Sequence, residues 1–278
     1  MKLFVLISTL GEGIRRIPVM LLPQRTDVHY VVVWQRNHVE IPMADASSAG
    51  DWTERADVTL VEMEGIGLCR SRNRAIQLAL DLQEDPLDDA VFLIADDDEH
   101  FDPEAFQRIL ATYQKYDKLD AALFRLRSSS DNQYFKPYPS QLTNYKRRPR
   151  SYYPCSWEIT LRHRVCLSGI RFDERFGLGA DKLCAGEEDV LLTDVSRRGF
   201  NILIVPEDIG TTDPVTTGDR VLDAKVLRSK GAVYGYQLSL PEAFIRSWRE
   251  AISLAIRHRT SAMYLFRKLW YGVKYIRS

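Results

Sequence analysis

The sequence predicts an α/β domain with a mostly parallel central sheet, followed by a helical C-terminal appendage. Short, continuous apolar runs recur along the first half of the chain, and segments with helical spacing separate them. Such continuous apolar strands are typical of a sheet that is covered by helices on both faces. The chain has 278 residues, of which 45% are hydrophobic, and this is enough to form a sizeable core.

The predicted strands are apolar runs rich in β-branched residues: 3–8, 28–34, 57–61, 90–95, 121–126, 157–161 and 201–205. Helical spacing predicts helices at 68–83, 103–116 and 187–198, and two more after Leu240. Asp102 is placed as an N-cap before Pro103, and Gly199 as a C-cap. Residues 128–154 lack a clear period, so we expect a long, partly mobile loop with a functional role.

Charge and composition exclude several classes of protein. Lys plus Arg and Asp plus Glu both total 38, so no overall field favours nucleic acid as a partner. No apolar run reaches the roughly 18 residues of a membrane span. The four cysteines show no C-x-x-C spacing, which fits free thiols in a reducing cytoplasm. We divide the chain into the α/β domain, 1–218, and a helical extension, 219–278.

Four carboxylates follow directly after the predicted strand 90–95: Asp96, Asp97, Asp98 and Glu99. In open α/β sheets, ligands bind at the carboxyl ends of the strands. Adjacent carboxylates need a compensating cation to ionise together, and their hard oxygens suit Mg²⁺ or Mn²⁺, which usually complete their shell with phosphate oxygens and water. The cluster therefore predicts a phosphate-bearing ligand; a solvated acidic loop is the alternative.

A second acidic cluster, Glu187, Glu188 and Asp189, opens a predicted helix after a Gly-rich turn. Acidic residues also favour helix N-termini for purely electrostatic reasons. The pairing of the two clusters indicates more, because attack on a sugar phosphate needs one acidic site for a metal and another for proton abstraction.

In order and spacing, several motifs resemble glycosyltransferase family 2, whose members have the GT-A fold, a Rossmann-like fold that binds nucleotide-diphospho-sugars. The motifs lie between Lys2 and Gly218: ISTLGEG, GLCRSRNRAI, FLIADDDEHFDPEAF, FDERFGLG, GEED and RRGFNILIVPE. The resemblance covers both acidic clusters, the first as the Asp-x-Asp motif that closes a strand and the second as the acidic motif that opens a later helix. Assembly of a bacterial surface polysaccharide is the role that it suggests most often.

The resemblance assigns roles to residues in both clusters. Asp96 is expected near the ribose and, with Asp98, at the metal; Asp97 lies between them. Glu188 matches the catalytic base, with Asp189 in reserve. The remaining nucleotide-binding residues are Thr9 and Arg72, and the acceptor-side residues are Trp157 and Glu187. For Trp157, an ordinary core position is the alternative.

The implied reaction is inverting transfer from a nucleotide diphosphate donor, expected to be a UDP-sugar, with Mn²⁺ or Mg²⁺ as cofactor and a glycan or lipid-linked acceptor. Two features depart from the family. After the second strand the chain reads Trp34, Gln35, Arg36, Asn37, without the usual Asp for the nucleobase. Where many relatives carry a metal-binding His, Asp213 is the nearest candidate.

Two other classes of function remain open. One is a metal-dependent nucleotide-sugar hydrolase or nucleotidyltransferase, and the other is a catalytically silent GT-A-like binding module. From Ala251 to Ser278 the chain has six Arg or Lys and no acidic residue. This terminal helix has one apolar face, Ala262, Phe266, Leu269, Val273 and Ile276. It predicts either a contact with the inner face of the cell membrane or packing against the domain or another subunit.

Overall fold

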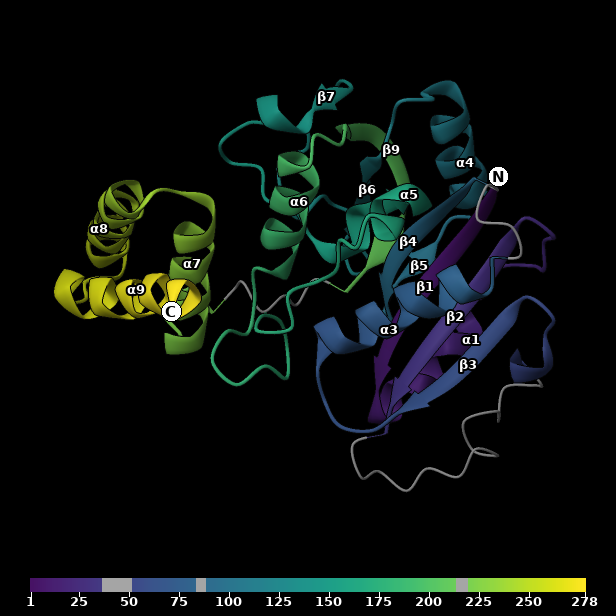
Figure 1. The fold of residues 1–278 in the computed structure, drawn as a ribbon, viewed down its shortest axis with the longest axis horizontal. Coiled ribbons are helices and arrows are strands. Elements are labelled where there is room, and N and C mark those ends of the chain that lie inside the picture. The colour runs from purple at the N-terminus through teal and green to yellow at the C-terminus, as the bar shows by residue number, and fades with distance from the viewer. Residues whose placement is uncertain (37–51, 84–88, 214–219) are drawn as a thin grey trace. The chain divides into compact units, whose positions relative to one another are not determined.

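The computed structural model describes residues 1–36, 52–83, 89–213 and 220–278 (Figure 1). A nine-stranded sheet has the order β3-β2-β1-β4-β8-β6-β9-β5, with β7 paired to β9. Its strands are β1 (Lys2–Leu10), β2 (Val28–Gln35), β3 (Val58–Met63), β4 (Ala90–Asp96), β5 (His100–Phe101), β6 (Ala121–Ser128), β7 (Thr143–Asn144), β8 (Ile159–Arg162) and β9 (Ile202–Thr212).

The strand directions confirm a mostly parallel sheet. Strands β3, β2, β1 and β4 are parallel, and β6 is parallel to β9. Strand β8 lies antiparallel between β4 and β6, so β4 and β6 run in the same direction. The parallel register aligns Ser8 of β1 with Asp96 of β4. The carboxyl ends of these strands therefore meet at one edge, where the first acidic cluster lies.

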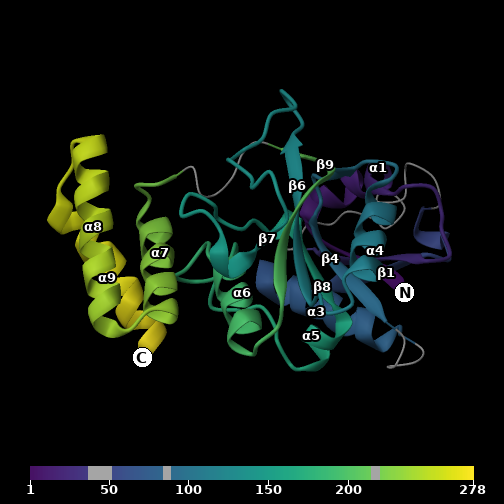
Figure 2. The same ribbon diagram turned by 90° about the horizontal axis from the view of Figure 1, so that it is seen from above.

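Helices cover both faces of this sheet, as the continuous apolar strands predict. Helices α1 (Ile17–Met20) and α4 (Ala105–Lys115) pack with the side chains of Leu3, Val5 and Ile7 in one core. Helix α3 (Leu68–Asp81) lies on the opposite face (Figure 2). There the Ser71 hydroxyl donates to the Ser8 hydroxyl oxygen at 2.9 Å. Alternate residues of β1 thus serve opposite helix layers.

Two predicted boundaries were wrong. Helix α4 begins at Ala105, with Glu104 as its N-cap. The Asp102 carboxylate instead forms an ion pair with Arg108 at 3.0 Å. Trp157 and Glu158 lie in a short 3-10 turn before β8 and not on the strand itself. The C-cap at Gly199 is confirmed, because this residue has φ +84° and its N–H donates to the Ser196 carbonyl.

The chain divides into two compact units. The first unit comprises Met1–Ile66, Arg70–Arg171 and Asp194–Pro214 and contains the whole described sheet, with α5 (His163–Leu167). The second unit comprises Gly67–Cys69, Phe172–Thr193 and Val215–Ser278. The predicted boundary at 218/219 falls in the segment 214–219, outside the described residues.

The helical C-terminal part contains α7 (Ala224–Gln237), α8 (Leu240–His258) and α9 (Ala262–Arg277). The two helices after Leu240 were predicted, but α7 was not. A Cβ atom on Gly231 of α7 would lie 1.8 Å from the Leu269 carbonyl oxygen, and one on Gly272 of α9 would lie 1.9 Å from the Arg228 carbonyl oxygen. These glycines, which weaken a helix in isolation, here let two helix backbones approach closely.

The apolar face predicted for the terminal helix is used inside the second unit. Phe266, Leu269 and Val273 of α9 are buried in a core with residues of α7 and α8, and Ile276 is buried with Val190 and Val233. This face therefore packs against the protein itself, one of the two alternatives predicted for the terminal helix. Among the described helices, none combines the length and apolar character needed to span a bilayer.

Candidate active site

Asp96 ends β4 and is fixed by hydrogen bonds from two elements. The buried Arg72 side chain of α3 donates through Nη2 to both carboxylate oxygens of Asp96, at 2.8 and 3.1 Å. The Ser156 hydroxyl, which comes from the turn before β8, donates to Oδ2 at 3.1 Å. Asp96 is thus a positioned acceptor, and Ser156 is a partner that the sequence pattern did not reveal.

Asp97 turns toward the end of β1. The Thr9 hydroxyl donates to its Oδ2 at 2.6 Å, and Arg16 forms an ion pair with its Oδ1 at 2.5 Å. Burial raises the pKa of Asp97, while Thr9 and Arg16 oppose this shift. A Cβ atom on Gly13 would lie 2.0 Å from Asp97 Oδ2 and 2.7 Å from Thr9 Oγ1. Gly13 therefore makes room for the Thr9–Asp97 contact.

We expect Gly13→Ala to destabilise the protein by about 1–3 kcal/mol, because the added methyl group forces Asp97 and Thr9 apart in a packed site. Chemical denaturation measures this free energy of unfolding. The matched control is Glu12→Ala in the same short helix, at an exposed side chain, which we expect to change stability by less than about 0.5 kcal/mol. Equal effects of the two substitutions would contradict the packing argument.

Asp98 lies in a concentration of negative charge. Burial raises its pKa to about 6, and the neighbouring charges of Asp96, Asp97 and Asp213 add to the shift. Within the described part of the chain, its carboxylate forms no hydrogen bond or ion pair. Asp213 follows β9, where its Oδ1 accepts a hydrogen bond from the Ser129 hydroxyl at 2.9 Å. A bound cation would relieve this repulsion.

Glu99, the fourth carboxylate, has a different environment. Its side chain is fully buried, and its Oε1 accepts a hydrogen bond from the backbone N–H of Asp96 at 2.7 Å. Burial raises the pKa of Glu99 well above its ordinary value, so the fold favours the protonated form of this side chain. Glu99 thus fixes the backbone of the segment that carries Asp96, Asp97 and Asp98.

The second cluster begins α6 (Glu187–Arg197), in the segment that belongs to the second unit. Gly186 has φ +92°, a conformation that favours glycine, and forms the turn into the helix. Glu187 is buried, and its carboxyl carbon lies 3.4 Å from the position of a Cβ on Gly177. Glu188 and Asp189 are only half-buried. Of the three, Glu188 and Asp189 are thus the accessible carboxylates.

The site residues fall into two groups. The structure brings together Thr9, Arg72, Asp96, Asp97 and Asp98 in the first unit, while Glu187, Glu188 and Asp189 belong to the second unit.

Trp34, in the stretch that lacks the usual nucleobase Asp, is a core residue. Its side chain is fully buried, and its Nε1 donates to the Gly11 carbonyl at 2.9 Å. Asn37, noted in the same stretch, lies outside the described residues. Trp157 is partly buried against the main core, and its ring centroid lies 5.8 Å from that of Phe135. Core packing, the alternative considered for Trp157, accounts for these contacts.

Sequence reasoning missed a buried ion pair that joins the predicted loop 128–154 to Glu158, in the run predicted as a strand. Lys136 Nζ lies 2.5 Å from Glu158 Oε1, and their side chains are 1% and 0% exposed. The hydroxyls of Tyr138 and Tyr152 donate to the two oxygens of Glu158 at 2.7 and 2.6 Å. This network anchors the segment beside Ser156, the partner of Asp96. A lysine among tyrosines in YFKPYP was the only available signal.

Lys136→Met is expected to lower the free energy of unfolding by about 3–5 kcal/mol, because it leaves the Glu158 charge buried without its counter-ion. Chemical denaturation is again the measurement. The control is Arg15→Met, which removes an exposed ion pair with Glu12 and should cost about 0–1 kcal/mol. A loss for Lys136→Met that is no larger than the control would show that the buried pair is not required.

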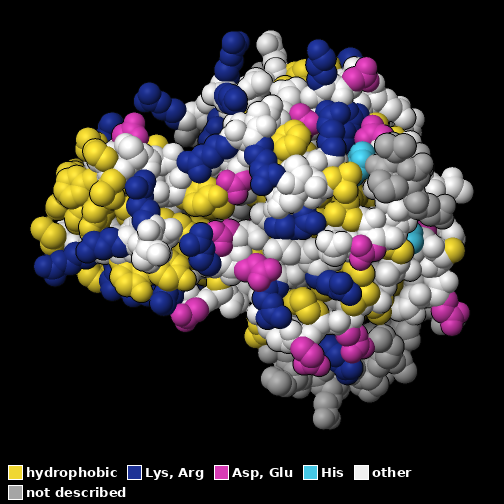
Figure 3. Space-filling view, in the orientation of Figure 1, with side chains coloured by type: hydrophobic (Ala, Val, Ile, Leu, Met, Phe, Trp, Pro, Cys, Tyr) yellow, Lys and Arg dark blue, Asp and Glu magenta, His cyan; other side chains and the backbone are white. Residues whose placement is uncertain are grey.

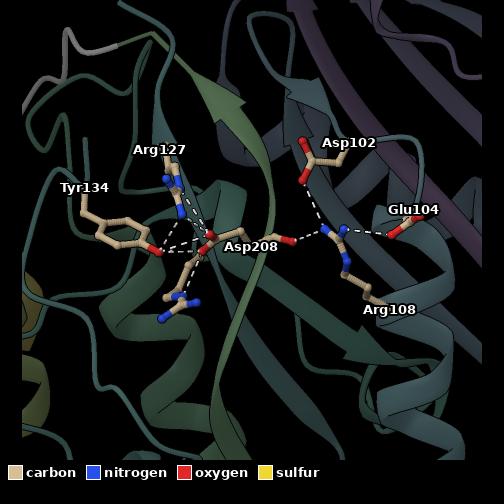
Figure 4. Close-up of polar contacts among 7 residues, drawn as sticks. Asp102, Glu104, Arg108, Arg127, Tyr134 and Asp208 are labelled. Atoms are coloured by element: carbon tan, nitrogen blue, oxygen red, sulfur yellow. Dashed lines mark hydrogen bonds and ion pairs between the residues drawn. The ribbon is translucent and has the colours of Figure 1, made fainter. Parts of the chain in front are cut away.

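Asp208 anchors β9 on both sides of the strand (Figure 4). Its carboxylate accepts hydrogen bonds from Arg125, Arg127 and the Tyr134 hydroxyl at 2.7–3.1 Å. Its backbone carbonyl accepts from Arg108 of α4 at 2.7 Å. The register of β6 and β9 shifts at this point, as at a β-bulge. These contacts fix the part of β9 that leads to Asp213.

Comparison with known proteins gives the fold. No family model matches the sequence, and no curated protein matches it. Residues 1–349 of S. aureus TarS superpose with a TM-score of 0.60 at 15% identity, covering 95% of this chain and 73% of that one. The same fragment in complex with UDP-GlcNAc gives 0.58 at 15% identity, with 95% and 74% covered.

A third solved structure is the mannosyltransferase PcManGT from Pyrobaculum calidifontis in complex with GDP-Man and Mn²⁺. It gives a TM-score of 0.51 at 11% identity, covering 99% of this chain and 75% of that chain. At these identities the likeness concerns the backbone fold. The chain therefore has a GT-A-like α/β fold, shared with these solved structures.

Proposed function

We propose that the protein is an inverting, metal-dependent glycosyltransferase of family 2. It transfers a sugar from a nucleotide diphosphate, expected to be UDP, to a glycan or lipid-linked acceptor. The observation that carries the proposal is the arrangement at the end of β4. Arg72 and Ser156 hold Asp96, Thr9 and Arg16 hold Asp97, and Asp98 is left among carboxylates.

The donor set at this strand end fits a hard divalent cation. Among the described residues, no three His, Cys, Asp or Glu side chains form a complete metal site. One or two carboxylates are nevertheless the usual protein contribution to a Mg²⁺ that also binds substrate phosphates. Asp98 and Asp96 would be these ligands, with Asp213 as a third candidate. When bound, Mn²⁺ or Mg²⁺ would stabilise negative charge on the departing diphosphate.

The protein's own residues would bind the donor and move one proton. Arg72 donates two hydrogen bonds to Asp96 and would orient this carboxylate toward the ribose. Thr9 and Asp97 would contact the nucleotide beside it. Glu188 accepts the proton of the acceptor hydroxyl, whose oxygen forms a bond to the anomeric carbon as the bond to the nucleotide diphosphate breaks. Asp189 is the reserve base, and Trp157 and Glu187 remain acceptor-side proposals. The burial of Glu187 favours an indirect role for it.

The ligands of the structural neighbours support this assignment by analogy of fold. TarS was solved with UDP-GlcNAc, and PcManGT with GDP-Man and Mn²⁺. In this proposal the protein is a bacterial, cytoplasmic enzyme of polysaccharide synthesis that attaches to the inner face of the cell membrane. The catalytic domain is proposed as 1–218 and the helical extension as 219–278, with contact between subunits as a further role of the extension.

Calorimetric titration of a panel of nucleoside diphosphates, with and without Mn²⁺, tests the donor site. We expect one nucleotide to bind in a Mn²⁺-dependent manner. Binding of no nucleotide would contradict the proposal in favour of a catalytically silent module. Incubation of the matching nucleotide-sugar then separates the enzyme classes, because a hydrolase releases sugar or sugar phosphate without an acceptor.

A further inference from the structure

The outward face of α8 carries large apolar side chains that no described residue of the second unit covers. Ile245, Ile252 and Ile256 are 56%, 47% and 76% exposed. Their spacing of seven and four residues places them on one side of the helix. The opposite side, with Ala243, Ser247, Ala251 and Leu254, is buried. Helix α8 therefore has an inner apolar face and a second apolar stripe toward solvent.

Positive charge borders this stripe. Arg249 and Arg257 are exposed beside the isoleucines, and neither forms an ion pair with a described residue. From Leu240 to Ser278 the chain has eight Arg or Lys and two acidic residues, Glu242 and Glu250. Glu250 is already paired with Lys230. Figure 3 shows apolar side chains and Lys or Arg side chains intermingled over α8 and α9.

The charges distinguish between two occupants of such a stripe. A symmetric contact with a second copy would bring together two surfaces that carry the same excess of positive charge, and this is unfavourable. An anionic lipid surface is complementary to both features, because it attracts Arg side chains and accepts isoleucines at the boundary of its acyl chains.

We propose that the Ile245–Ile252–Ile256 stripe of α8, with Arg249 and Arg257, is a docking surface for an anionic lipid bilayer. The terminal helix α9, whose apolar face is buried in the unit, supports α8 from within. The helix lies in the plane of the interface and does not cross the bilayer. The inference rests on the membrane attachment included in the proposed function and assigns it to these residues. The surface does not involve the carboxylates at the end of β4.

Flotation of the full-length protein with vesicles of phosphatidylcholine, with and without phosphatidylglycerol, tests the surface. We expect binding only to the vesicles that contain phosphatidylglycerol, and a decrease as NaCl is raised from about 0.05 to 0.5 M. The triple variant Ile245→Gln/Ile252→Gln/Ile256→Gln is expected to lower the partition coefficient at least about tenfold. Arg249→Gln/Arg257→Gln should lower it by about tenfold as well.

The matched control is Val19→Gln/Leu167→Gln, which changes two apolar side chains that are 69% and 52% exposed in the first unit. We expect it to bind vesicles like the wild type. No vesicle binding, or an equal loss in the control, would overturn the proposal. So would a concentration-dependent dimer in sedimentation that the triple variant abolishes, since that result assigns the stripe to a second copy. Nucleotide binding by the triple variant, measured in parallel, keeps this outcome separate from the donor site.

Discussion

Glu188→Gln is expected to reduce kcat by about 100- to 10,000-fold, the usual contribution of a general base. Glutamine preserves the size and hydrogen-bonding shape of the side chain but cannot accept the acceptor's proton. Donor affinity should stay within about twofold, because the proposed donor site consists of Thr9, Arg72 and Asp96–Asp98 and does not include Glu188. The measurement is release of nucleoside diphosphate in the presence of a glycan acceptor, together with calorimetric donor binding.

Two neighbouring substitutions serve as controls. Asp189→Asn tests the reserve base at a similarly half-buried position, and it should retain most activity. Glu187→Gln changes a buried side chain, and any loss that it causes should accompany a lower melting temperature. Full activity of Glu188→Gln with an inactive, folded Asp189→Asn would move the base to Asp189. Full activity of both variants would contradict a catalytic role for the cluster.

The sheet was predictable because its strands are continuous apolar runs, and β1, β2 and β4 are buried almost along their whole length. Helix α7 was not predicted, because its glycines suggest a break when the helix is taken alone. Their role depends on the backbone of α9, which lies about 40 residues further along the chain. Local propensity cannot register such a partner.

The first acidic cluster was predictable for a similar reason: its residues are adjacent in the sequence and follow a buried strand. Their different environments were not predictable. Arg72, Arg16 and Ser156 approach from separate elements and decide which carboxylate is paired. The Lys136–Glu158 pair joins residues that are 22 positions apart, one in the predicted loop and one in the short 3-10 helix Ser156–Glu158, so no local period indicates the contact.

Asp98→Asn is expected to abolish Mn²⁺-dependent nucleotide binding and, in the same protein, to raise its stability. The first effect should exceed about 100-fold in metal affinity, because an amide lacks the charge of the carboxylate at the centre of the cluster. Calorimetry with Mn²⁺ and the selected nucleotide measures it. Asp117→Asn, at an exposed position remote in sequence from the cluster, is the control and should bind as the wild type does.

The second effect follows from the pKa of Asp98, which is raised to about 6 from its ordinary value of 3.8. A raised carboxyl pKa means that the fold disfavours the charged form. The contribution of Asp98 to the free energy of unfolding is therefore largest below pH 4 and is lost as pH rises through 6. At pH 7.5 the metal-free wild type carries this penalty and the asparagine variant does not. Partial exposure and screening reduce the gain to about 1–2 kcal/mol, or roughly 2–6 °C in melting temperature.

The same pKa predicts that Mn²⁺ affinity of the wild type falls about tenfold between pH 7.5 and pH 5, because the metal binds the ionised carboxylate. Both measurements are needed together. A variant that loses metal binding and also melts at a lower temperature would be a damaged fold, whereas loss of binding with a higher melting temperature is the result expected of a carboxylate maintained for function at the expense of stability.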